Sequence, residues 1–318
     1  MKAEEVQEIL DCLSSERIKY HYFKDRYCFE LLSREVKSQG GELCIQALRR
    51  VRNARFLAKP SVKTMMAHIN PQRITVDDIE SYWPDSSEAF TLTMDCWGGG
   101  DKNWDQTSRL GCSLVLQLNF SSEHVNLLNK LVKPVRSKVG PFNRCLHPVN
   151  RQGRITLAWS RIDISFETNE ALIEEIQSDW IRNTGSAVER MQRIRRRNSA
   201  AKPRDGGYAI ECSYENLVEY HRLVVQRYEH LWPEAMLWAT IEFIRQELGI
   251  NKIFYHTYET GRKLKRAGEP PRSLYTKLPE QFGFRVQEQL PLFLEQDKWI
   301  NRVVKSIGPL AFYGLEMV

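Results

Sequence analysis

Residues 171–180 alternate between the two faces of a β-strand while their side chains change from apolar to polar. Because successive side chains leave a strand on opposite faces, Glu175, Gln177 and Asp179 are expected to share one face beyond the apolar Ile173. A buried carboxylate is costly unless it is paired, so two carboxylates with an amide between them indicate a strand end that opens into a cleft. A solvent-facing strand surface is the alternative interpretation of the same pattern.

The composition is that of a globular protein large enough for two compact parts. The chain has 318 residues, of which 42% are hydrophobic, and it shows neither a long uncharged apolar stretch nor a signal-peptide pattern. These features predict a cytoplasmic protein. The 7 cysteines are odd in number and include no Cys-x-x-Cys pair, so the sequence predicts neither a disulfide framework nor a metal site.

The net charge of +6 is concentrated in one segment of the chain. Residues 190–204 contain arginines and lysines without a single acidic residue, and the remainder of the chain is close to neutral. Such a segment suits the phosphate groups of a nucleic acid or of a nucleotide-bearing cofactor. A solvated connector that contains an Arg-rich helical turn is the alternative.

The hydrophobic pattern changes near residue 88. Residues 1–80 show mainly the spacing of amphipathic helices, and we predict a helical N-terminal segment over residues 1–88. Strand and helix patterns then follow in mixed order. They predict a mixed α/β (α+β) domain over residues 89–318, a mixed sheet with flanking helices, interrupted by an Arg-rich insertion at about residues 181–207.

Within the second part, turn and cap signals separate the individual elements. The apolar phase shifts inside the expected strand at residues 155–166, which predicts a bulge near Ser160 and Arg161. The other expected strands cover residues 91–94, 114–120, 171–180, 252–257, 284–288 and 303–315, and the expected helices begin near Ser121, Ser213, Pro233 and Ser273.

Two short motifs in the last two thirds of the chain resemble a known family. The segment Leu274-Tyr275-Thr276-Lys277-Leu278-Pro279-Glu280-Gln281-Phe282-Gly283-Phe284, with the order of elements from residue 112 onward, resembles the GNAT-type acetyltransferases, whose last helix carries a Tyr and runs into a Gly-Phe pair. The run Glu175-Ile176-Gln177-Ser178-Asp179-Trp180 is similar to a motif of GNAT-like modules in the polyvalent proteins of phages and conjugative elements. The resemblance implies a GNAT-like sheet, an acyltransferase activity and an origin in a phage or another mobile element.

The resemblance also implies acetyl-coenzyme A as cofactor, bound where the polar-ended strand separates from the strand at residues 252–257. The helix that begins near Pro233 would direct its N-terminal amides at the pyrophosphate. The residues implied in cofactor binding are Ile176, Ser178, Trp232, Glu234 and Thr257. The chain departs from the family at this place, because the bulky run at residues 228–234 replaces the Gly-rich phosphate loop, and its Glu234 would repel a pyrophosphate.

Acyl transfer to an amine requires a base for the ammonium, a donor for the thioester carbonyl and an acid for the departing thiolate. Glu175 or Asp179 is the predicted base, with Gln177 on the same face, and Tyr275 matches the family's tyrosine and is the predicted acid. His256 is a further candidate acid, base or substrate ligand. The expected acceptor is the amine of a small molecule or of a protein. Core packing of Tyr275 and a single structural hydrogen bond of His256 are the alternatives.

A second hypothesis comes from a different class of protein. The chain would be a non-catalytic nucleic-acid-binding or protein-binding module that keeps a degenerate acetyltransferase scaffold in a phage–host conflict system. It rests on the missing phosphate loop and on six basic residues, which are Arg193, Arg195, Arg196, Arg197, Lys263 and Arg266. An enzyme that acts on another substrate through Glu175, Gln177 and Asp179 is a third hypothesis.

Overall fold

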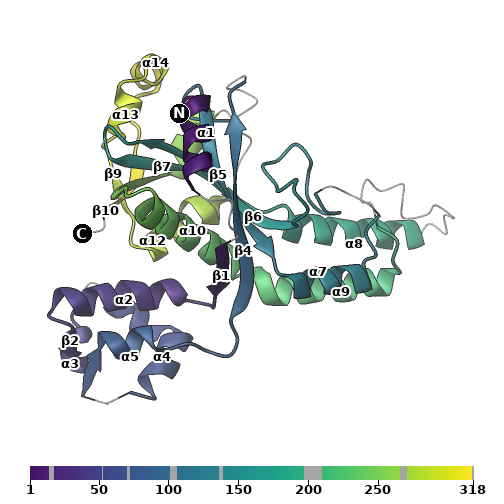
Figure 1. Cartoon of the computed structure of the whole chain (residues 1–318), viewed down its shortest axis with the longest axis horizontal. Coiled ribbons are helices and arrows are strands. Elements are labelled where there is room, and N and C mark those ends of the chain that lie inside the picture. The colour runs from purple at the N-terminus through teal and green to yellow at the C-terminus, as the bar shows by residue number, and fades with distance from the viewer. Residues whose placement is uncertain are drawn as a thin grey trace. The chain divides into compact units, whose positions relative to one another are not determined.

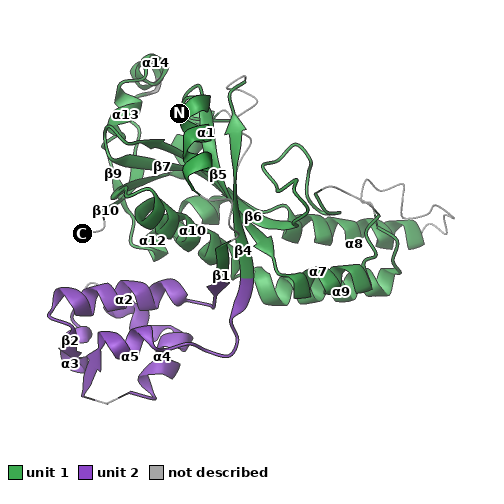
Figure 2. Cartoon of the chain, viewed as in Figure 1, with its two compact units in different colours: residues 1–20, 90–318 green, residues 21–89 purple. Residues whose placement is uncertain are grey.

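The computed structural model has a mixed α+β fold, which confirms the predicted fold class. It describes residues 1–13, 18–51, 53–69, 72–100, 106–135, 139–196, 210–265 and 271–316. The chain divides into two units, one of residues 1–20 and 90–318 and the other of residues 21–89 (Figure 2). This division differs from the expected segment 1–88, because helix α1 (Ala3–Cys12) packs against strand β5 (Cys112–Phe120) and belongs to the larger unit.

The smaller unit is helical with one short antiparallel ladder between β2 and β3. Its aromatic core includes Tyr27 and Phe56, whose rings meet edge to face at 5.7 Å. Its elements are α2 (Arg26–Ser38), β2 (Glu42–Cys44), α3 (Ile45–Leu48), the 3₁₀ helix η1 (Ala54–Ala58), α4 (Pro60–Met66), β3 (Arg73–Thr75) and α5 (Val76–Glu80).

The larger unit is built around one mixed sheet (Figure 1). The ladders from β4 to β7 are antiparallel, β7 and β8 are parallel, and β10 pairs antiparallel with both β8 and β9. The strands in their order across the sheet are β1 (Ile18–Tyr22), β4 (Glu88–Gly98), β5, β6 (Thr156–Ser165), β7 (Glu170–Gln177), β8 (Lys252–His256), β10 (Phe312–Glu316) and β9 (Arg285–Gln287).

Helices cover both faces of this sheet, which explains why β5 and β6 are buried along nearly their whole length. On one face, Leu172 and Phe254 form an apolar cluster with residues of α11, α13 and α14. On the other face, α10 packs on β6 and β7. The helices of this unit are α1, α7 (Ser122–Leu131), α8 (Trp180–Arg196), α9 (Tyr214–Tyr228), α10 (Trp232–Glu242), the π-helix η3 (Phe243–Glu247), α11 (Tyr258–Lys265), the 3₁₀ helix η4 (Arg272–Tyr275), α12 (Lys277–Gln281), α13 (Leu292–Glu295) and α14 (Lys298–Ile307).

Several boundaries differ from the prediction. The expected strand at residues 303–315 is wrong over its first part, because Asp297 caps a helix, α14, through the N–H groups of Trp299 and Ile300. The basic residues that follow β8 begin within helix α11. The expected Arg-rich connector starts as the 17-residue helix α8. None of the helices in the described part of the chain has the length and apolar character needed to cross a bilayer.

Helices α7, α8 and α9 pack together beside the sheet (Figure 1). A chain of buried polar groups joins them. Nε1 of Trp180 donates to the hydroxyl of Tyr220 at 2.9 Å, and this hydroxyl lies 2.8 Å from Nε2 of His124. Nδ1 of His124 lies 3.2 Å from the hydroxyl of Tyr228, and its ring stacks on Phe120. Every polar atom of the imidazole therefore has a partner without water.

This burial makes His124 a source of acid sensitivity. Burial, with a smaller effect of Arg227, lowers the pKa of His124 from 6.5 to about 3. As the pH falls below about 6.5, the unfolded chain binds a proton that the native state does not, so the free energy of unfolding should fall by up to about 1.4 kcal/mol per pH unit until the pH approaches 3. Urea unfolding between pH 7 and pH 4 should show a shallower dependence for His124→Gln. Equal slopes for both proteins would contradict this assignment.

Candidate active site

The pairing between the parallel strands β7 and β8 stops in the middle of the sheet. It ends at Ile173 and Tyr255, one residue before β8 itself ends at His256, whereas β7 continues to Gln177. We call the point at which the chain leaves β7 after His256 the divergence. The ladder between β7 and β6 shifts at the same place, between Arg161 and Ile162. This shift lies close to the predicted bulge, but the additional residue is Glu174 on β7. β7 remains paired with β6 up to Gln177, but on the side that faced β8 the carbonyl of Glu174 accepts a hydrogen bond from the side chain of Lys265 instead of from a strand.

Ser108, Glu174 and His256 form a fully buried hydrogen-bonded group on one face of this divergence. The N–H of Ser108 donates to one carboxylate oxygen of Glu174 at 2.9 Å, and its hydroxyl donates to the other, also at 2.9 Å. Nε2 of His256 lies 3.1 Å from Glu174 and 2.9 Å from the Ser108 hydroxyl. In a nucleophilic triad the serine and the carboxylate bind opposite nitrogens of the imidazole. Here both bind Nε2, so the group is not such a triad.

Charges in this group are set by burial and by the neighbouring cations. Burial raises the pKa of Glu174, but the hydrogen bond with His256 and the charges of Lys265 and Arg161 outweigh it and lower the pKa to about 2. Burial lowers the pKa of His256, against the opposing effect of Glu174. We therefore assign an ionised Glu174 and a neutral imidazole that donates from Nε2. Nδ1 of His256 is then an acceptor, and it has no hydrogen-bond partner among the described residues.

Glu175 forms an ion pair with Arg161, which is only 2% exposed. The guanidinium of Arg161 binds one carboxylate oxygen through Nε at 2.8 Å and through the terminal nitrogen at 2.7 Å. Burial raises the pKa of Glu175, but Arg161 and Lys265 outweigh it, and the net shift is downward. Glu175 is therefore a firmly ionised carboxylate and a weak base.

Lys265 and Tyr275 lie across the divergence from the two glutamates. Nζ of Lys265 donates to the carbonyl of Glu174 at 2.6 Å and to the hydroxyl of Tyr275 at 3.2 Å. Burial lowers the pKa of Lys265, whereas burial and the charge of Glu175 raise the pKa of Tyr275 well above 10. Tyr275 is thus protonated at neutral pH.

Gly261 of helix α11 borders both the Tyr275 ring and the His256 side chain. A Cβ atom on Gly261 would lie 3.5 Å from both Cβ of His256 and Cε1 of Tyr275. The structure therefore brings together three of the predicted catalytic residues, which are Glu175, His256 and Tyr275.

The other two predicted catalytic residues have different surroundings. Gln177 pairs with Trp159 at the end of β7. Asp179 lies beyond β7 and is fully buried, and it accepts hydrogen bonds from the backbone of Arg144, from Nδ1 of His147 and from Arg182. These contacts join a loop to the start of α8, so the geometry gives Asp179 a structural role.

The residues implied in cofactor binding are mostly engaged in internal contacts. Ile176 is buried opposite Ser160, and Ser178 donates to the carbonyl of Leu157 at 2.5 Å. Thr257 donates to the carbonyl of Ala311 and caps the start of α11.

The helix that was expected to face the pyrophosphate begins at a covered end. Trp232 and Glu234, in the first turn of α10, are buried with 9% and 3% exposure. This helix end therefore offers little room for a phosphate, in line with the missing Gly-rich loop.

The predicted phosphate contacts lie on helix surfaces. Arg195 pairs with the exposed Glu215 at 2.6 Å, and Nε of Arg193 donates to the carbonyl of Glu189. Arg196 and Lys263 are exposed, and Arg197 and Arg266 lie outside the described residues.

Sequence reasoning missed Ser108, Arg161, Glu174 and Lys265. Arg161 gave a usable signal, because it is a charged residue inside an otherwise apolar strand. Lys265 gave none, because it lies in a basic run of the kind that usually faces solvent.

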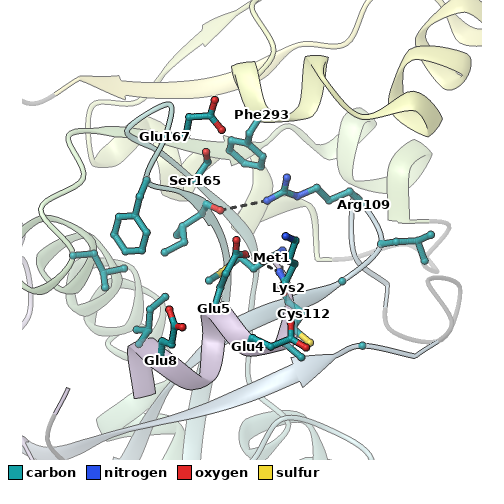
Figure 3. Close-up of a pocket in the computed structure, with 18 of the residues that line it drawn as sticks. Met1, Lys2, Glu4, Glu5, Glu8, Arg109, Cys112, Ser165, Glu167 and Phe293 are labelled. Atoms are coloured by element: carbon teal, nitrogen blue, oxygen red, sulfur yellow. Dashed lines mark hydrogen bonds between the residues drawn. The ribbon is translucent and has the colours of Figure 1, made fainter. Parts of the chain in front are cut away.

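A groove of about 980 Å³ is lined in part by Arg109, the residue after Ser108, whereas the cluster residues themselves are not among the residues that line it. Arg109 binds both carboxylate oxygens of Asp163, at 2.7 and 2.9 Å. Its guanidinium also donates to the carbonyl of Ile164 at 3.3 Å, and Figure 3 shows the guanidinium hydrogen-bonded at the edge of the groove. Carboxylates outnumber cations around this groove, and we call it the acidic groove. The carboxylates are those of Glu4, Glu5, Glu8, Glu167, Glu247 and Asp297. Its negative potential favours a cationic ligand.

Comparisons of the chain with protein-family models, with curated proteins and with solved structures find no significant match.

Proposed function

We propose that the chain is a GNAT-like acyltransferase, which transfers an acyl group from an acyl-coenzyme A thioester to an amine. The observation that carries the proposal is the end of the pairing between β7 and β8 at Ile173 and Tyr255, with ionisable side chains gathered at that point. Ligands of mixed sheets commonly bind beyond the carboxyl ends of parallel strands. The divergence is also the feature that the resemblance to GNAT enzymes implies.

In this proposal Tyr275 is the general acid for the leaving thiolate. Its hydroxyl oxygen accepts a hydrogen bond from Lys265, so its own proton remains available for donation. Transfer of this proton gives the free thiol of coenzyme A and a phenolate, and the adjacent ammonium of Lys265 stabilises that phenolate. Glu175 is a positioning residue that acts through its charge on Lys265 and Tyr275.

The general base in this proposal is Nδ1 of His256. The bond between Nε2 and Glu174 fixes the tautomer and leaves the lone pair of Nδ1 for the ammonium proton of the acceptor. The acidic groove supports an amine acceptor, because its carboxylates concentrate cations. Loss of one proton converts the acceptor ammonium into the nucleophilic amine.

Cofactor binding is the first prediction to measure. Acetyl-coenzyme A and coenzyme A should each raise the midpoint temperature of thermal unfolding, and each should release or absorb heat in titration calorimetry. A ligand that binds only the native state adds about 2.7 kcal/mol to the free energy of unfolding at 100 times its Kd. ATP serves as the matched control, since it carries a polyphosphate and adenosine without the pantetheine arm. Absence of heat and of stabilisation at millimolar acetyl-coenzyme A, or equal effects of ATP, would contradict the proposal.

A further inference from the structure

A second groove lies between α8 and the loop at residues 141–147. It has a volume of about 620 Å³, and Arg144, Arg190, Arg193 and His147 contribute to its walls. No Asp or Glu is among the described residues that line it, so its surface potential is positive. We call it the arginine groove.

Buried polar contacts fix the loop wall of the arginine groove. The carboxylate of Asp179 accepts a hydrogen bond from the N–H of Arg144 at 3.0 Å and from Nδ1 of His147 at 2.8 Å. From α8, Nδ2 of Asn183 donates to the carbonyl of Phe142 at 2.7 Å. These contacts attach the loop to the start of α8, and Arg144 of the loop lines the same space as Arg190 and Arg193 of the helix.

The helix wall presents a single face along much of α8. Asn183, Ser186, Arg190 and Arg193 follow one another at intervals of three or four residues, which places them on the same side of the helix. At 1.5 Å per residue, this face is about 15 Å long. Successive phosphates of one duplex strand rise by about 3.4 Å, so the face is long enough for several phosphates of a polymer.

The geometry points to a binding site for the phosphate backbone of a nucleic acid in the arginine groove. Guanidinium groups bind phosphate oxygens through paired hydrogen bonds and stay charged at physiological pH. The exposed Arg196 adds a further positive charge in the last turn of α8, whereas Arg195 is paired with Glu215. No Phe, Tyr or Trp is among the described residues that line the groove, so backbone contacts rather than base stacking provide the affinity, and binding is independent of base sequence.

The test measures anisotropy of a labelled DNA strand, and of its duplex, over a salt series from about 50 to 300 mM. The logarithm of the association constant should fall linearly with the logarithm of salt concentration, by about 0.7 per neutralised phosphate for the single strand and about 0.9 for the duplex. Each of Arg144→Gln, Arg190→Gln and Arg193→Gln should reduce the slope by about 1. The triple variant should bind at least 10-fold more weakly at the lowest salt.

Arg222→Gln is the matched control, because this substitution removes the same charge at a residue outside the groove. Arg222 lies on α9 and its side chain is 60% exposed. It should leave the slope unchanged. A triple variant with the wild-type slope would overturn the inference, as would an equal effect of Arg222→Gln. The inference would also be overturned if inorganic phosphate displaced more DNA than chloride does at the same ionic strength. The groove would then be a site for small anions. The affinity of the triple variant for acetyl-coenzyme A separates this inference from the acyltransferase proposal. This affinity should equal the affinity of the wild type.

Discussion

Tyr275→Phe is expected to lower the rate of acyl transfer by a factor of about 10² to 10⁴, the usual contribution of a general acid. The substitution removes the one proton that the proposal assigns to the leaving thiolate. Lys265 keeps its bond to the carbonyl of Glu174, so the variant should fold. Affinity for acetyl-coenzyme A, measured by calorimetry, should stay within a few-fold of the wild type while the rate of thiol release falls.

Tyr255→Phe is the matched control for this experiment. Tyr255 lies next to Tyr275, with ring centroids 5.6 Å apart, and is equally buried. Its hydroxyl has no hydrogen-bond partner in the described part of the chain, so its removal should leave the rate unchanged and should not destabilise the fold. Equal rates for Tyr275→Phe and the wild type would show that the phenol is a core contact and not an acid.

Arg161→Met is expected to lower the free energy of unfolding by about 3 kcal/mol at neutral pH, because it leaves the carboxylate of Glu175, which is only 16% exposed, without its partner. The pKa of Glu175 is lowered in the native protein, so its ion pair stabilises the fold above the unfolded pKa, and this stability is lost as the pH falls through the native pKa. Without Arg161 the pKa of Glu175 rises. The deficit of the variant relative to the wild type should therefore shrink as the pH falls from 7 to 4.

Urea unfolding measures this effect, and two further variants test its cause. The double variant Arg161→Met with Glu175→Leu should recover most of the lost stability, because replacement of both charges by apolar groups removes the unpaired ion. Arg73→Met in the smaller unit is the control, since its ion pair with Glu42 is exposed and should change stability little. If the double variant is no more stable than Arg161→Met alone, packing of Arg161 rather than its charge supports the fold.

Local patterns predicted much of the larger unit. Strand β5 could be predicted because its apolar residues alternate strictly and Ser121 follows as a helix cap, and the structure has both features. The helix after Ser213 was predicted for the same reason. Strand β7 was predicted over residues 171–180, and the structure has it one residue earlier at its start and ending at Gln177. The polar residues of the predicted strand lie in two environments, since Glu175 pairs with Arg161 whereas Asp179, beyond the strand, binds the loop before β6. Alternation assigns faces within one strand and contains no information about which distant segment covers each face.

The amino-acid sequence by itself determined the fold class, the β7 and β8 strands, and the proximity of Tyr275 to a Gly-Phe turn, because these depend on periodicity, caps and turn residues within about 20 positions. Only the tertiary structure decided that Glu174, Lys265 and Arg161 are buried together and that the pairing of β7 with β8 stops at Ile173. The physical reason is that a charged side chain is stable in a core only beside its partner. Ser108 and His256 are 148 positions apart in the chain, and such distant partners meet only when the whole sheet is assembled.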